Sequence, residues 1–155
     1  HRGLAFYTIG QRHGFVIDHQ ALKKSQTINY DKNRAPALLV VNKIPEKNRL
    51  VVAEKAASLV NKFTIKELHF INNSQQQLWQ EKASFYALVK IRNQGKLIPC
   101  QVKTNGNQLL VKTQDKIFAP ASGQSAVFYR DTRTNLLVIA GALIDNGVGE
   151  ASNSD

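Results

Sequence analysis

The sequence predicts a mainly β protein: a small β-rich module followed by a six-stranded antiparallel β-barrel. Short runs rich in β-branched and aromatic residues recur in the second half, and turn residues separate several of them. Their close spacing favours a small barrel over a βαβ sheet. The clearest run is FAPASGQSAVFYR, residues 118–130, in which Pro120 and Gly123 mark a turn. The apolar residues 126–129 that follow are too few for a helix, so residues 125–129 are a predicted buried strand.

The N-terminal part begins with FYTIGQRHGFVI, residues 6–17. Gly10 and Gly14 break any helix there, so a short strand or a turn is expected. Residues 18–35 are polar and predict a long exposed loop, a length that is typical of functional or disordered segments.

Two further β-rich runs, residues 37–43 and 49–54, flank a connection that holds Pro45 and Asn48. This arrangement predicts a β-hairpin. Residues 55–62 place apolar side chains at helical spacing and predict one short helix. We expect a domain boundary near residue 62.

The second domain, residues 63–145, contains the barrel, and its best turn signal is Asn105-Gly106. Residues 146–155 are rich in Gly, Ser and Asn and predict a disordered tail. The abrupt start at His1 suggests a piece of a longer protein. The six predicted strands are residues 63–71, 85–92, 98–104, 108–113, 125–129 and 136–144.

Charge is the most informative part of the composition. The chain has 155 residues, 43% of them hydrophobic, and a formal net charge of +10. Residues 1–62 hold 11 basic and 4 acidic side chains, and residues 63–155 hold 10 and 7. This balance favours a polyanionic partner such as nucleic acid. The alternative is a basic surface that only aids solubility. No run is long and apolar enough for a membrane helix.

The strand at residues 85–92 has two distinct faces. Phe85, Ala87, Val89 and Ile91 alternate with Tyr86, Leu88, Lys90 and Arg92. Cations beside an exposed aromatic ring suit RNA, because cations hold phosphates and the ring stacks on unpaired bases. The alternative interpretation is a barrel strand with a solvated outer face.

No reaction centre is visible in the residues. Cys100, the only cysteine, alternates with Ile98 and Val102 and predicts a buried, inert thiol. The four histidines have no metal-ligand spacing, and the Gly-containing segment at residues 10–14 lacks the features of a phosphate-binding loop. We therefore predict no catalytic residues, no metal and no cofactor in this chain.

Three ordered motifs resemble a known family, the tRNA-specific 2-thiouridylases of the MnmA/TrmU type. They are HRGL followed by YTIGQR (residues 1–4 and 7–12), IPC followed by VK (98–100 and 102–103), and GQSAVFY (123–129). The resemblance covers about residues 1–145. Two segments depart from the family pattern, residues 14–17 and 139–142.

The resemblance implies a role in sulfur transfer to C2 of the wobble uridine (U34) in tRNAs for Lys, Glu and Gln. The single cysteine indicates a reducing, intracellular setting, so we expect the cytoplasm. No Lys/Arg-rich amphipathic helix appears, so we expect no membrane partner. Older catalogues call such enzymes methyltransferases. In the family, an N-terminal domain binds ATP and carries the cysteines that receive persulfide sulfur from a relay donor. This chain would be the central domain and the C-terminal translation-factor-like barrel, which hold the tRNA.

The resemblance also implies tRNA contacts at Arg92, Asn93 and Gln124, although Asn93 stands where the family has an aromatic residue. The alternation of residues 85–92 adds Lys90 to the predicted tRNA contacts, and Arg12 and Gln11 are the next candidates. Two other hypotheses stay open: a stand-alone RNA-binding barrel of translation-factor type, and a self-contained enzyme that uses Cys100.

Overall fold

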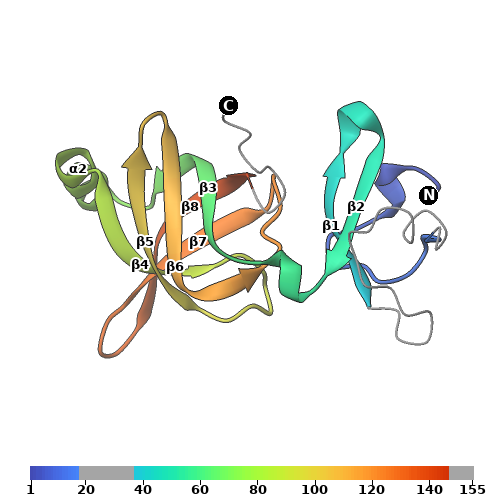
Figure 1. Cartoon of the computed structure of the whole chain (residues 1–155). Coiled ribbons are helices and arrows are strands. Elements are labelled where there is room, and N and C mark those ends of the chain that lie inside the picture. Colours follow the sequence, from blue (N-terminus) through green and yellow to red (C-terminus); the bar gives the residue numbers. More distant parts are fainter. Residues whose placement is uncertain (18–36, 147–155) are drawn as a thin grey trace. The chain divides into compact units, whose positions relative to one another are not determined.

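A computed structural model describes residues 1–17 and 37–146 of the chain (Figure 1). The chain divides into two compact units, His1–Ser58 and a second unit that begins at Leu59. The predicted loop at residues 18–35 lies outside the described residues. So does the predicted tail, except Asn146, which ends the last strand.

The first unit is built around a β-hairpin, as predicted. Strand β1 (Leu38–Ile44) pairs antiparallel with β2 (Arg49–Glu54), and a 3-10 turn, η3 (Pro45–Lys47), connects them. Asn48 closes this turn in the left-handed conformation, with φ of 45°. The segment before residue 18 holds the 3-10 turn η1 (Leu4–Phe6) and then Gly-hinged turns. It lies against β1 through Gly10 N donating to Val40 O.

The helix predicted at residues 55–62 is wrong. Only the short 3-10 turn η4 (Ala56–Ser58) forms there, and β3 (Leu59–Phe70) begins directly after it. The register shift between Val60 and Lys62 places extra residues on β6, because Val60 pairs with Ile117 and Lys62 with Lys112. The apolar spacing resembled a helix because it spans two elements: Ala56 lies in η4, whereas Leu59, Val60 and Phe63 lie in β3.

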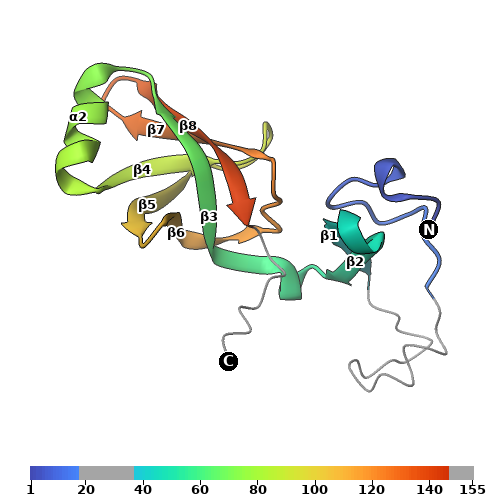
Figure 2. The ribbon, with the colours of Figure 1, turned by 90° about the horizontal axis from the view of Figure 1, so that it is seen from above.

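The second unit is a closed antiparallel barrel with strand order β3-β6-β5-β4-β7-β8, which confirms the predicted fold class. Figure 2 shows β5 and β6 on one side of the barrel and β7 and β8 on the other. The interior is packed with apolar side chains, among which Val102, Val111, Phe128 and Ile144 have no exposed surface. The remaining strands are β4 (Ser84–Lys90), β5 (Ile98–Asn105), β6 (Gln108–Phe118), β7 (Ser125–Asp131) and β8 (Leu136–Asn146).

The sequence interpretation missed one helix, α2 (Asn73–Lys82), which lies at one end of the barrel between β3 and β4 (Figures 1 and 2). Its start is capped by Asn72, whose Oδ1 accepts a hydrogen bond from Gln75 N at 3.1 Å. Its end is closed by Ala83 in the left-handed conformation. Trp79 packs on Phe70 and thereby fixes α2 to the barrel. No described helix is long and apolar enough to cross a membrane.

Candidate nucleic-acid interface

Arg92 lies in a turn, not in a strand, because β4 ends at Lys90. Its Nη2 donates a hydrogen bond to Ala119 O at 3.0 Å, and its guanidinium lies 5.2 Å from the centre of the Phe118 ring. Burial lowers the pKa of Arg92 from its ordinary value, because the charge is partly withdrawn from water. Arg92 therefore ties the 91–97 connection to the turn that precedes β7.

Gln124 holds the same turn from its other side. Its Oε1 accepts from Ala121 N at 3.1 Å, and Ile144 N donates to its backbone oxygen at 2.7 Å. These contacts fix the side chain, and among the described residues its Nε2 bonds to none. Arg92 and Gln124 thus bond to one backbone segment, residues 119–121, and the fold brings them together.

Lys90 and Asn93 lie close to Arg92 in the chain, at the end of β4 that is far from α2. Lys90 is half-buried and pairs with Val127 of β7. Asn93 is exposed in the turn closed by Gly95 N donating to Arg92 O. Four of the six predicted contacts therefore gather at one end of the barrel.

The other two, Gln11 and Arg12, belong to the first unit. Gln11 accepts a hydrogen bond from Thr8 N through Oε1 at 3.0 Å and donates from Nε2 to His13 O at 2.7 Å. Its amide thus shapes the Gly-rich turn, while Arg12 is exposed.

A row of outward side chains that the sequence interpretation did not recognise crosses four adjacent strands. Strand register places Lys62 opposite Lys112, Lys112 opposite Gln101, and Gln101 opposite Tyr86. We call these four residues the cationic row. Both lysines are exposed, and Tyr86 is 76% exposed. Among the described residues the only ion pair is Lys66–Asp145, so neither lysine is neutralised by a carboxylate.

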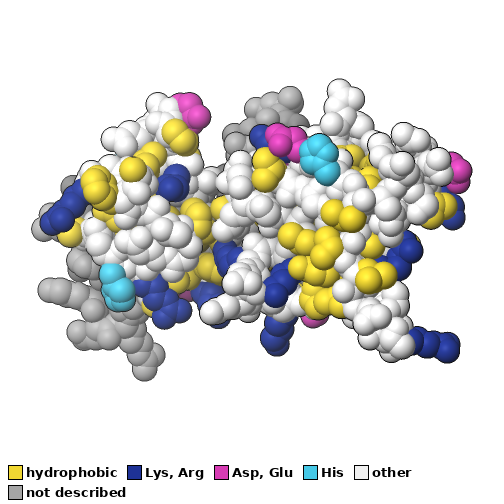
Figure 3. Space-filling model, turned by 180° about the vertical axis from the view of Figure 1, so that it is seen from behind, with side chains coloured by type: hydrophobic (Ala, Val, Ile, Leu, Met, Phe, Trp, Pro, Cys, Tyr) yellow, Lys and Arg dark blue, Asp and Glu magenta, His cyan; other side chains and the backbone are white. Residues whose placement is uncertain are grey.

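The opposite side of the barrel has a different character. Figure 3 shows the side on which β7 and β8 lie, with hydrophobic side chains gathered on it and Lys and Arg side chains around them. Leu136, Leu137 and Val138 of β8 are each about half exposed. On the β3–β6–β5–β4 side, the exposed Tyr86 ring and the two lysines of the cationic row lie in one register row.

Cys100 lies inside the barrel, as predicted, with 5% of its surface exposed. Burial raises the pKa of its thiol to about 12, which keeps the sulfur protonated and unreactive. Among the described residues no group of three or more His, Cys, Asp or Glu side chains could hold a metal ion.

These features define a two-part β protein whose second part is a closed six-stranded barrel. Residues 60–143 match the family described as the aminomethyltransferase beta-barrel domain, and residues 1–54 match the tRNA methyl transferase PRC-barrel domain. Proteins called tRNA-specific 2-thiouridylase MnmA match almost the whole chain. That of Thermosipho melanesiensis is 32% identical over 97% of the chain, and that of Sulfurimonas denitrificans is 30% identical over 94%.

A third relative, MnmA 3 of Phocaeicola vulgatus, is 35% identical over 93% of the chain. The match spans 35%, 36% and 32% of the length of these three relatives, respectively. The chain belongs to the tRNA-specific 2-thiouridylase family, and it corresponds to about a third of the length of these relatives.

Proposed function

We propose that this chain holds tRNA for a parent enzyme that exchanges the C2 oxygen of the wobble uridine for sulfur. Family membership supports this proposal, because relatives called tRNA-specific 2-thiouridylases match the chain over about a third of their length. ATP, the persulfide donor and the choice among tRNAs for Lys, Glu and Gln belong in this proposal to the catalytic part of the parent enzyme. The proposal places the parent enzyme in the cytoplasm.

The cationic row is the observation that carries the proposal. Like charges directly opposite one another on neighbouring strands destabilise a sheet, so a bound anion would relieve the repulsion between Lys62 and Lys112. Phosphates would supply that anion, with release of counterions. Tyr86 at the end of the row offers a ring on which an unpaired base can stack.

The turn end of the barrel provides a second set of contacts. We assign direct contacts there to Lys90, Asn93 and the free Nε2 donors of Gln124, and to Arg12 in the first unit. Arg92 and Gln11 act in this proposal chiefly by holding the loops in shape, because their polar groups already bond to backbone.

The test is the affinity of the 155-residue chain for an unmodified tRNA transcript, measured by fluorescence anisotropy over a series of salt concentrations. Replacing Lys62 and Lys112 together by Ala should weaken binding and lower the slope of log Kd against log salt by about 2. The control variant loses Lys47 and Arg133 instead, both exposed and both outside the row.

Equal slopes of log Kd against log salt for the two double variants would contradict the proposal. An affinity that does not change with salt concentration would contradict it too. A structured RNA of the same length but without a tRNA fold serves as competitor. If it binds as tightly as tRNA, the barrel is a general RNA-binding module and the stand-alone hypothesis is favoured.

A further inference from the structure

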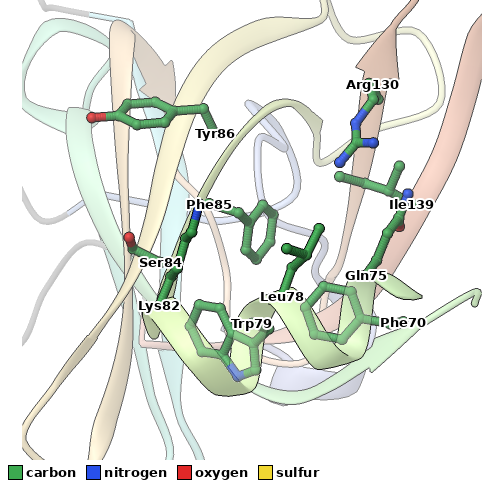
Figure 4. Close-up of a pocket in the computed structure, with 10 residues that line it drawn as sticks. All are labelled: Phe70, Gln75, Leu78, Trp79, Lys82, Ser84, Phe85, Tyr86, Arg130 and Ile139. Carbon is green, nitrogen blue, oxygen red and sulfur yellow. The ribbon is translucent and has the colours of Figure 1, made fainter. Parts of the chain in front are cut away.

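A pocket of about 310 Å³ lies between α2 and the barrel, at the end far from the 119–124 turn. The bottom of the pocket is formed by three aromatic side chains. Phe70, Trp79 and Phe85 pack against one another with ring centres 5.6 to 6.2 Å apart. Figure 4 shows these three rings on one side of the pocket and Arg130 of β7 on another, with its guanidinium directed toward the pocket. The pocket is therefore a half-open aromatic site with a cation at its rim.

One polar atom in this pocket has no partner. Oε1 of Gln75, which lines the pocket from the first turn of α2, is shielded from solvent and accepts no hydrogen bond among the described residues. It is the only buried side-chain nitrogen or oxygen atom of the described chain in this condition. Because this oxygen has no accessible surface in the empty pocket, a ligand N–H can reach it only after the Gln75 side chain turns toward the pocket.

The rim carries positive charge and joins the cationic row. Lys82 and Arg130 line the pocket, and both are exposed. Tyr86 lines the rim too, while in Figure 4 its ring points away from Phe85 toward the outside of the barrel, where it ends the row. An anionic chain held along the row would therefore reach the mouth of the pocket.

We propose that this pocket binds a single unpaired nucleobase of the RNA that the cationic row holds. The base would lie against the Trp79 and Phe85 rings, and Arg130 or Lys82 would hold the adjoining phosphate. The Gln75 side chain would turn toward the pocket, so that its Oε1 accepts a hydrogen bond from an N–H of the base. Aromatic contact, an acceptor and cations together match a nucleotide, whereas an apolar ligand would leave the acceptor and both cations unused. The inference rests on the proposed function, because it names the part of the RNA that is bound.

Trp79 is the only tryptophan of the chain, so its fluorescence reports directly on this pocket. The experiment titrates the full chain with the nucleoside monophosphates AMP, GMP, CMP and UMP, and in parallel with ribose 5-phosphate, which has the phosphate but no base. At least one nucleotide should change the emission with a Kd of about a millimolar, and ribose 5-phosphate should not. Gln75→Leu should weaken this binding about tenfold, whereas Gln76→Leu, on the exposed side of α2, should not change it.

If either helix variant fails to fold, as judged by circular dichroism, the pair Arg130→Gln and Arg133→Gln replaces it, and only the first should weaken binding. Equal responses to nucleotide and to ribose 5-phosphate, or none up to about 10 mM, would overturn the inference. Salt-dependent tRNA binding through the row would then still support the proposed function. Nucleotide binding without tRNA binding would overturn the proposed function and leave the pocket as a nucleotide site.

Discussion

At the end of the barrel formed by the 119–124 turn, polar side chains bond to backbone, whereas at the α2 end the amide oxygen of Gln75 has no partner. Arg92 and Gln124 each satisfy a backbone group of residues 119–121. Along β8 the two ends are clearly separated, because the turn bonds to Ile144 while the pocket is lined by Ile139. Polar side chains beside this loop are thus already engaged, because their hydrogen bonds to backbone hold the loop in its conformation.

The two ends are independent only if the barrel interior between them excludes water, and the reactivity of Cys100 tests this. The pKa of its thiol is raised from an ordinary value of 9.0 to about 12 because burial disfavours the thiolate. At neutral pH the folded chain should therefore contain about a thousandfold less thiolate than the unfolded chain. Labelling by a thiol reagent should be slower by a comparable factor under native conditions than in denaturant. Rapid native labelling would show that one end opens into the core, and would revive the hypothesis that Cys100 is a nucleophile.

The same thiol makes stability depend on pH in a defined direction. The pKa of the Cys100 thiol is higher in the folded chain than in the unfolded chain. Its contribution to the stability of the fold is therefore fully present below about pH 9 and is lost as the pH rises toward 12. The free energy of unfolding of the natural chain, minus that of Cys100→Ala, should therefore fall by about 1.4 kcal/mol per pH unit in this window. Urea unfolding at pH 8, 10 and 11 measures it, and a constant difference would show that the thiol is exposed to water.

Removing Arg92 should loosen the turn end. Arg92→Ala leaves Ala119 O without its donor and uncovers Phe118, so we expect a loss of about 2 kcal/mol in the free energy of unfolding. Lys96→Ala, an exposed cation of the same connection, should change stability by less than about 0.5 kcal/mol. If the two variants are equally stable, Arg92 does not hold the turn and is available as a direct tRNA contact.

Local patterns made much of the barrel predictable. Asn105-Gly106 indicated a hairpin, and β5 and β6 indeed pair from Asn105 to Gln108. The alternation around Cys100 indicated its buried side. The helix predicted at residues 55–62 was wrong because the apolar residues at helical spacing are divided between η4 and β3. Helix α2 was missed although Asn72 and the run of strong helix formers after it were visible, since the polar residues at its start also suit a turn.

The candidate site was harder to predict because it depends on strand pairing. Lys62, Lys112, Gln101 and Tyr86 come from four strands, and only the register places them in one row. Arg92 and Gln124 were chosen from the resemblance, and their hydrogen bonds to the backbone of residues 119–121 could not be read from residue types. Whether they touch tRNA stays a prediction.

The sharpest form of the comparison is a pair of matched substitutions with opposite effects. Gln124→Leu removes the acceptor for Ala121 N and should lower the free energy of unfolding by about 1 kcal/mol. Gln75→Leu removes a buried oxygen that has no partner and should raise it by about 1 kcal/mol, because Leu and Gln have similar helix propensities and the desolvation penalty disappears. Urea unfolding of both variants beside the natural chain measures the two signs. A loss of stability in Gln75→Leu would mean that the amide already has a partner in solution, such as a bound water, and would remove the reason to treat the α2 end as unsatisfied.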